Sequence, residues 1–223
     1  MSAKLFWGAI IKFLLGVVLV GALIFLPAGS LLYFNGLLLM GILFVPMLAA
    51  GIVMMVKNPS LLKSRLDAKE KEKDQDLVVK LSGIMFLAGF VVAGLGYRFS
   101  WYILPRAVSI GGAVALLIAY ILYAEVLREN TYLSRTIKVQ EGQKVVDTGL
   151  YGIVRHPMYS ATLLLFISMP IILGSLYALI PFLAYPFIIG VRIRNEEELL
   201  TAELPGYAEY KEKVKYRLIP FVW

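Results

Sequence analysis

The side chains best suited to chemistry form two short clusters that flank one long apolar run. The first cluster, Arg155-His156-Pro157, stands at the start of that run. A proline is favoured in the first turn of a helix and pushes the residue before it into an extended conformation. The free N–H groups of this helix start, beside Arg155 and His156, could bind a carboxylate or a phosphate. The pattern could equally be a simple helix start whose arginine reaches the lipid headgroups.

The second cluster, RIRNEEE, begins at Arg192, where the apolar run ends. In a helix, Arg192 and Glu196 are four residues apart and project from the same side. The run between the clusters is too long for one crossing of a bilayer, so we expect a hairpin that brings the clusters together. The facing residues would be Arg155, His156 and Tyr159 on one side and Arg192 and Glu196 on the other. Cationic and anionic groups at one membrane-edge pocket suit a zwitterionic ligand that carries a nucleoside.

The scarcity of cysteine and histidine excludes several kinds of site. The chain has no cysteine and one histidine, His156. Disulfides, thiolate metal sites and cysteine nucleophiles are therefore excluded, and we expect no metal, because zinc and haem sites depend on His and Cys ligands. A reaction in this chain would have to work by positioning its reactants.

The composition predicts that these clusters belong to a membrane protein. Of the 223 residues, 60% are hydrophobic and 17% are charged, and the mean hydropathy is +0.78. Soluble globular proteins average about 45–50% apolar and about 25% charged residues. We therefore expect an all-α integral membrane protein, and exclude disordered, collagen-like and coiled-coil structures.

Turn-forming residues divide the apolar runs into about six transmembrane helices. Residues 13–56 contain no charged side chain, and the turn formers at 27–30 divide them into two spans. Pro170 and Gly174 make the last run, residues 158–191, a helical hairpin. The expected spans are residues 5–26, 31–56, 77–97 and 107–124 and the two arms of the hairpin. The number would be five if the hairpin is only partly inserted.

The basic residues set the expected orientation. With six spans and a cytosolic N-terminus, all 22 Lys and Arg residues except Arg98 and Arg106 fall on the cytosolic side. Topology then explains the net charge of +7, so we expect no nucleic-acid partner. The cytosolic loop 57–80, with its alternating charges, is expected to form an amphipathic helix at the interface. The apolar part of residues 1–26 is longer than that of a signal peptide, so we expect it to be retained.

The polar residues divide the chain into two functional parts. We expect residues 1–127 to form the first four transmembrane helices, and residues 128–223 to form the catalytic, cofactor-binding region. This second part would contain a loop, the hairpin and a C-terminal helix or lid that begins at the Pro205-Gly206 turn. The tyrosines of this lid would also suit a helix that anchors the chain at the membrane surface.

Three motifs carry more specific information: GLYGIVRHPMYS from residue 149, VRIRNEEELL from residue 191 and LPGYAEYKEKVKYRLIPFVW from residue 204. In this order and spacing they resemble the isoprenylcysteine carboxyl methyltransferase family of integral-membrane methyltransferases. The resemblance covers about residues 140–220. In the N-terminal half, KNPSLLKSRL and the EN of LREN resemble prokaryotic members, which implies a prokaryotic plasma membrane. The distribution of the basic residues predicts that both termini lie in the cytosol.

The resemblance implies S-adenosyl-L-methionine as the cofactor, and a lipophilic methyl acceptor that enters from the bilayer among membrane lipids. The cofactor-binding residues it implies are Gln140, Gln143, Lys144, Val145, Val146, Tyr151, His156, Pro157, Met158, Tyr159, Glu196 and Glu197. The catalytic residues it implies are Arg192, Glu196 and Arg155, with Arg192 and Tyr207 contacting the substrate. It leaves the oligomeric state open.

The acceptor atom and two other functions remain open. A carboxylate is the expected acceptor, because it is already a nucleophile and Arg192 could orient it. An amine or hydroxyl would need a base, for which Glu196 or Glu197 would serve. Sterol reductases, which use NADPH, have a similar C-terminal half, although three adjacent glutamates would repel the 2′-phosphate. In a non-enzymatic lipid-binding protein, the same clusters would be topology signals only.

Overall fold

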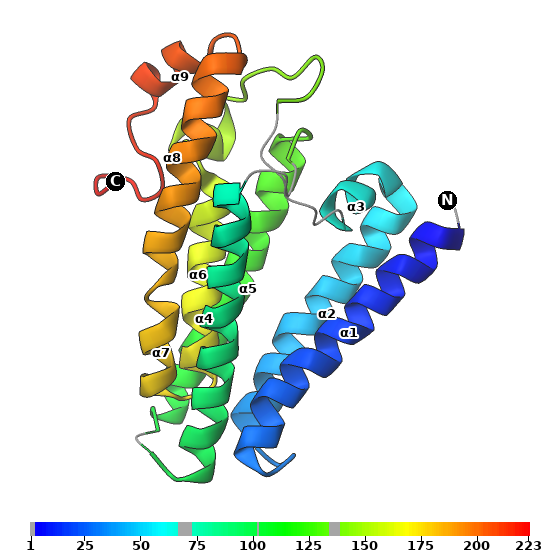
Figure 1. The fold of residues 1–223 in the computed structure, drawn as a ribbon, viewed down its shortest axis with the longest axis vertical. Coiled ribbons are helices and arrows are strands. Elements are labelled where there is room, and N and C mark those ends of the chain that lie inside the picture. The colour runs from blue at the N-terminus through cyan, green and yellow to red at the C-terminus, as the bar shows by residue number, and fades with distance from the viewer. Residues whose placement is uncertain (1–2, 67–72, 102, 134–138) are drawn as a thin grey trace.

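The chain folds as a bundle of helices. The computed structural model describes residues 3–66, 73–101, 103–133 and 139–223. Within these residues, helices are joined by loops that include one isolated bridge between Ile103 and Ser175. The helices in Figure 1 are α1 (Ala3–Ala28), α2 (Phe34–Lys57), α3 (Pro59–Leu66), α4 (Lys73–Arg98), α5 (Arg106–Glu129), the 3-10 helix η1 (Gly149–Gly152), α6 (Pro157–Ile172), α7 (Leu176–Phe182), α8 (Tyr185–Glu203) and α9 (Tyr207–Lys213).

Five helical stretches of the described residues are long and apolar enough to cross a membrane. They are Leu5–Ala28, Phe34–Lys57, Asp76–Arg98, Arg106–Glu129 and Leu176–Glu203, of which the last joins α7 and α8. A further apolar helix, α6, has only 16 residues. The prediction of an all-α integral membrane protein is confirmed, and the counts of five and six spans differ only in whether α6 is included.

Several predicted helix ends differ from the structure. α1 continues through Pro27 to Ala28 and stops at Gly29, whose φ of 65° is typical of a helix end. The predicted loop 57–80 extends too far, since α4 already begins at Lys73, and α5 continues to Glu129 rather than residue 124. Hydropathy marks the apolar part of a helix, and charged residues extend the helix beyond it. The expected loop contains the helix α3, whose place at the membrane interface stays a prediction, and residues 67–72 lie outside the described residues.

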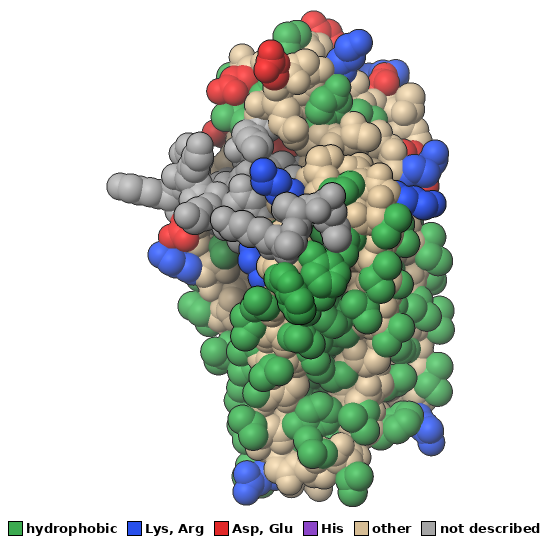
Figure 2. All heavy atoms as spheres, turned by 90° about the vertical axis from the view of Figure 1, so that its right-hand side faces the viewer, with side chains coloured by type: hydrophobic (Ala, Val, Ile, Leu, Met, Phe, Trp, Pro, Cys, Tyr) green, Lys and Arg blue, Asp and Glu red, His purple; other side chains and the backbone are tan. Residues whose placement is uncertain are grey.

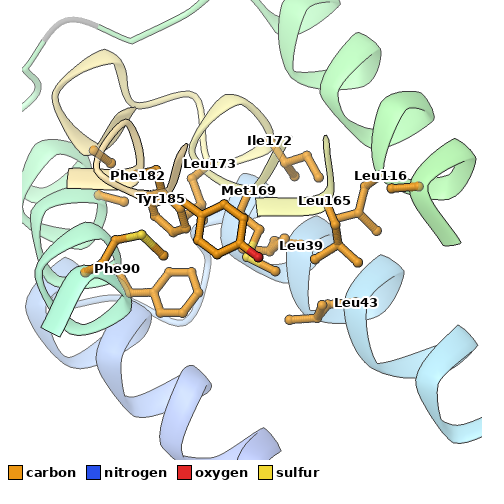
Figure 3. Packing of buried hydrophobic residues seen from close by; sticks show 14 of the residues in the cluster. Leu39, Leu43, Phe90, Leu116, Leu165, Met169, Ile172, Leu173, Phe182 and Tyr185 are labelled. Atoms are coloured by element: carbon orange, nitrogen blue, oxygen red, sulfur yellow. The ribbon is translucent and has the colours of Figure 1, made fainter. Parts of the chain in front are cut away.

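The core is built around α6, which lies against α5 and folds back on α7 and α8 as the predicted hairpin. Figure 3 shows its buried side chains, to which α2, α4, α5, α6 and α7 contribute Leu39, Phe90, Leu116, Met169 and Phe182, respectively. At Gly112 of α5, a Cβ atom would lie only 2.8 Å from Cγ2 of Ile171. Small residues permit such close approach of membrane helices. This packing places the start of α6 and the end of α8 at the same end of the bundle.

Charged side chains gather at one end of the molecule, and apolar side chains cover most of the rest (Figure 2). We call this end the polar end; it carries η1, α9 and the last turns of α8 (Figure 1). Below it, large apolar side chains such as Leu26 and Phe187 have 76% and 79% of their surface exposed. Such surfaces are expected of helices that face lipid. The functional residues must therefore be sought where the polar end meets this apolar surface.

Candidate cofactor pocket

A pocket opens at the polar end, between the start of α6 and the end of α8. The empty space between its walls is about 800 Å³, a volume that includes open solvent. The residues that border it are Asn130, Tyr132, Leu133, Gln143, Lys144, Val145, Val146, Tyr151, Arg155, His156, Met158, Tyr159, Arg192, Glu196, Leu200, Leu204, Tyr207 and Tyr210.

The phenol of Tyr159 joins the two charged groups of α8 that face the pocket. Its hydroxyl donates to Oε2 of Glu196 at 2.6 Å and accepts from Nε of Arg192 at 3.0 Å. Tyr159 and Arg192 are both buried, and the Tyr159 ring stacks on that of His156. Charge-assisted hydrogen bonds of this kind hold side chains in one orientation. The cationic and the anionic group of the pocket are therefore held in fixed positions relative to one another.

Glu197 lies beneath the pocket wall as a buried carboxylate with three basic partners. Its Oε1 accepts from Nε of Arg155 at 2.6 Å and lies 3.2 Å from Nε2 of His156. Its Oε2 accepts from Nε of Arg217 at 2.9 Å. We call these four residues the Glu197 cluster. It ties α8 to the segment before α6 and to the C-terminal segment.

The C-terminal segment after α9 runs along the residues that precede α6. The backbone N–H groups of Arg155 and His156 donate to the carbonyls of Tyr216 and Arg217, each at 2.9 Å. Nη1 of Arg155 donates to the carbonyls of residues 214–215 at 2.7 and 2.9 Å. Arg155, predicted as a catalytic residue, thus has its guanidinium bound within the protein, although its side chain borders the pocket.

Helix α9 covers one side of the pocket with buried tyrosines. The Tyr210 hydroxyl donates to the carbonyl of Tyr151 at 2.7 Å. The Tyr207 hydroxyl is buried and has no hydrogen-bond partner among the described residues. Burial, and then the charges of Glu197 and Glu196, raise the pKa of Tyr207 well above its usual value. A neutral phenol with an unused donor therefore stands in the wall, and buried groups of this kind usually have a partner.

The loop before η1 forms another wall. The side-chain oxygen of Gln143 accepts from the backbone N–H of Gln140 at 2.9 Å, and the Tyr132 hydroxyl donates to the carbonyl of Gly142 at 3.1 Å. The side chain of Gln140 donates to the carbonyl of Tyr132. Gln140 therefore shapes the loop from behind, while residues 143–146 border the pocket.

The end of α5 holds η1 in place. The Glu129 carboxylate accepts from the N–H of Leu150 at 3.0 and 3.2 Å, and the Asn130 amide donates to the Tyr151 hydroxyl at 3.0 Å. Gly149 has a φ of 53°, and a Cβ atom there would lie 1.4 Å from Oε1 of Glu129. A glycine is therefore required where the loop passes this carboxylate, and η1 can then present Tyr151 to the pocket.

Most of the predicted site residues border one pocket, as the hairpin required. Three do not: Gln140, Pro157 and Glu197. Pro157 begins α6, as expected. Of the N–H groups expected to be free at this helix start, that of Tyr159 is not free, because it donates to the carbonyl of His156 at 3.0 Å. Arg155 and His156, the side chains of the expected anion site, face the buried carboxylate of Glu197, and binding of an external anion there stays a prediction.

Several residues that border the pocket were not predicted: Asn130, Tyr132, Leu133, Leu200, Leu204 and Tyr210. Leu200 and Leu204 follow Glu196 in steps of four along the chain, so helical spacing could have identified them. The spacing of residues 130–133 gives no such signal, because tertiary folding alone brings them to the pocket. No group of three or more His, Asp and Glu side chains that could hold a metal occurs in the described part of the chain.

Comparison with known proteins supports the family resemblance that the three sequence motifs indicated. Residues 110–202 match the isoprenylcysteine carboxyl methyltransferase (ICMT) family. A Delta(14)-sterol reductase of Mus musculus is 29% identical over 91 residues, which make up 40% of this chain. The match covers 22% of the length of that curated relative. The part of the chain that matches the isoprenylcysteine carboxyl methyltransferase family thus contains most of α5, η1, α6, α7 and nearly all of α8.

Proposed function

We propose that this protein transfers a methyl group from S-adenosyl-L-methionine to a lipophilic acceptor at the membrane surface. The observation that carries the proposal is the pair Arg192 and Glu196, joined by Tyr159 in a pocket bordered by ICMT-family residues. In this proposal Glu196 matches the ammonium group of the cofactor in charge, and Arg192 matches a carboxylate of the acceptor. The unused hydroxyl of Tyr207 supplies a further donor at the same pocket.

The residues present fit such a cofactor by their chemistry. Val145, Leu200 and Leu204 border the pocket and offer apolar surface for the rings of a nucleoside. Bound S-adenosyl-L-methionine supplies an electrophilic methyl group. The residues that we assign to holding it are residues 143–146, Tyr151, His156, Met158, Tyr159 and Glu196. Gln140, Pro157 and Glu197 would support these residues from behind the wall.

A carboxylate is the acceptor that best suits Arg192 and Tyr207, which we do not assign to holding the cofactor. A carboxylate needs no general base, and the planar guanidinium of Arg192 is well shaped to orient one. Arg192 and Tyr207 would therefore contact the acceptor, while Arg155 would act by positioning the wall. For an amine or hydroxyl acceptor, Glu196 is the available base, because the oxygens of Glu197 are already engaged.

The charge distribution supports the proposed location. With the polar end in the cytosol, both termini are cytosolic, as the positive-inside rule favours. We assign the protein to a prokaryotic plasma membrane, with membrane lipids as partners and residues 128–223 as the cofactor-binding region. No metal or nucleic acid has a role in this proposal, and the division at residue 127 stays a prediction.

Binding of S-adenosylhomocysteine to the purified chain in neutral detergent tests the cofactor. We expect calorimetry to give micromolar-range affinity, and Glu196→Gln to weaken it about tenfold, as loss of a hydrogen bond to a charged group does. Glu198→Gln is the matched control, because Glu198 is exposed on the same helix. Folded wild-type protein that does not bind would refute the proposal. If S-adenosylhomocysteine binds, transfer of a radiolabelled methyl group from S-adenosyl-L-methionine to total lipid extract would identify the acceptor.

A membrane reductase is the alternative that a specific observation supports, because part of the chain matches a sterol reductase. The expected repulsion of a 2′-phosphate by three glutamates is weaker than predicted: Glu196 borders the pocket, Glu197 is paired and Glu198 is exposed. Titration with NADPH decides between the two functions. A non-enzymatic lipid-binding protein would be stabilised against heat by neither ligand.

A further inference from the structure

Arg65 lies outside residues 110–202, which match the family, yet α3 brings it to the start of α6. Its Nη1 and Nη2 atoms are 4.0 and 3.8 Å from Sδ of Met158, which borders the pocket. Its guanidinium also lies over the ring of Tyr123 of α5, 5.5 Å from the ring centroid. The arginine thus stands where α3, α5 and α6 meet, beside the pocket rather than among the residues that border it.

Among the residues that the structure describes, the charge of Arg65 has no anionic partner. Its Nε atom is buried and has no hydrogen-bond partner among the described residues, and no carboxylate of those residues pairs with the guanidinium. A thioether is a weak acceptor, and the face of a tyrosine ring attracts a cation only modestly. A donor of a charged group that stays unpaired away from water is costly. The site is therefore suited to an external oxyanion.

Helix α3 is held firmly enough to present this side chain. The side-chain oxygen of Asn58 accepts from the N–H of Leu61 at 3.1 Å, which caps the start of the helix. Leu62 is buried, and Nζ of Lys12 in α1 donates to the carbonyl of Leu66 at 2.6 Å. Both ends and the middle of α3 are thus attached to the transmembrane helices.

The surroundings suit an amphiphile rather than a free anion. The last turns of α2, which lead into α3, expose Ile52, Val53 and Val56, and α5 exposes Ile121 two residues before Tyr123. Figure 1 shows α2 and α5 diverging toward the end of the molecule where α3 lies. An apolar chain could therefore contact the helices while its head group reaches Arg65.

We propose that Arg65 binds the oxyanion of a lipophilic acceptor, a carboxylate or a phosphate, beside the Met158 side of the pocket. This inference rests on the proposed methyl transfer, and it narrows the substrate class to anionic amphiphiles. Arg65 determines specificity in this scheme and takes no part in holding the cofactor.

Photolabelling of the full chain in neutral detergent tests the proposal. The probes are a diazirine fatty acid, a diazirine lysophosphatidic acid and the matching fatty alcohol, at a pH where the acids are ionised. We expect at least one acid to half-saturate labelling at about tenfold lower concentration than the alcohol, and Arg65→Gln to abolish this preference. The acid that is preferred identifies carboxylate or phosphate as the recognised group. Arg65→Lys should restore part of the preference, and Lys63→Gln, an exposed position of α3, should leave it intact.

Equal labelling of wild type by acids and alcohol, or equal effects of the Arg65→Gln and Lys63→Gln variants, would overturn the proposal. A second test needs no variant: the labelled peptides of the wild-type protein are mapped with acids that carry the diazirine beside the head group. Absence of label from both α3 and the first turn of α6 would also overturn the proposal. S-adenosylhomocysteine binding is measured on the same samples. Acid selectivity without cofactor binding refutes the methyltransferase and leaves Arg65 as a lipid-anion site.

Discussion

Tyr159 sits between the two charged groups on which the proposed chemistry depends. Removing its hydroxyl in Tyr159→Phe deletes one bond to Glu196 and one to Arg192, while the ring can still stack on His156. We expect methyl transfer and S-adenosylhomocysteine affinity to fall about tenfold without loss of the fold. Tyr185→Phe is the control, because that buried phenol bonds Thr162 away from the pocket. Equal losses in both variants would contradict the assigned role.

Glu197 is expected to matter for stability more than for binding. Glu197→Gln leaves Arg155, His156 and Arg217 around a neutral side chain, and disrupting a buried ion pair costs about 3–5 kcal/mol. We expect thermal unfolding in detergent at a clearly lower temperature than for Glu203→Gln, an exposed glutamate of the same helix. Similar unfolding temperatures would show that the Glu197 cluster does not hold the fold.

At the residue scale, the sequence predicted which two charged side chains lie on one side of α8, but it did not predict the hydrogen bonds that connect them to other elements. Arg192 and Glu196 face one side because their spacing follows the helical repeat. The same repeat gives no information on burial, so it could not show that Glu197, one residue on, is turned inward to Arg155 and His156. It also could not show that the phenol of Tyr159 connects the pair, because that contact spans two helices.

Among the elements, η1 depends most on one residue. Gly149→Ala forces a left-handed backbone on alanine and drives a methyl group into the Glu129 carboxylate. The backbone term alone costs about 1–2 kcal/mol. We expect a lower unfolding temperature and weaker S-adenosylhomocysteine binding, since η1 carries Tyr151. Gly152→Ala, whose Cβ atom would lie 3.2 Å from the carbonyl oxygen of Asp147 at a residue without positive φ, should have a clearly smaller effect. Equal effects would show that the Glu129 contact does not restrict the loop.

The elements themselves were largely predictable where turn formers interrupt apolar runs. The hairpin of α6 with α7 and α8 turns after Ile172, close to Pro170 and Gly174, as expected. The start of α4 at Lys73 was not predictable from hydropathy, because a helix can continue into water on charged residues. The position of α3 against α6 was not predictable either, since it depends on a tertiary contact between Arg65 and Met158.

For the whole molecule, the orientation can be tested directly, because the chain has no cysteine to remove first. Leu32→Cys places a thiol in the exposed turn between α1 and α2, and Glu141→Cys places one in the exposed loop at the polar end. We expect a membrane-impermeant maleimide to label the first and not the second in intact cells. Labelling of the second alone would reverse the proposed topology.

The shortness of α6 has a consequence for the depth of the pocket. Sixteen residues span about 24 Å, whereas the hydrocarbon core of a bilayer is about 30 Å thick. α6 is the central helix and is packed among longer helices that can cross the bilayer, so its first turn is expected to lie below the level at which those helices leave the membrane. That turn borders the pocket. The floor of the pocket would then lie below the headgroups, and the polar head of an acceptor could reach the proposed methyl donor while its chain stays among the lipid tails.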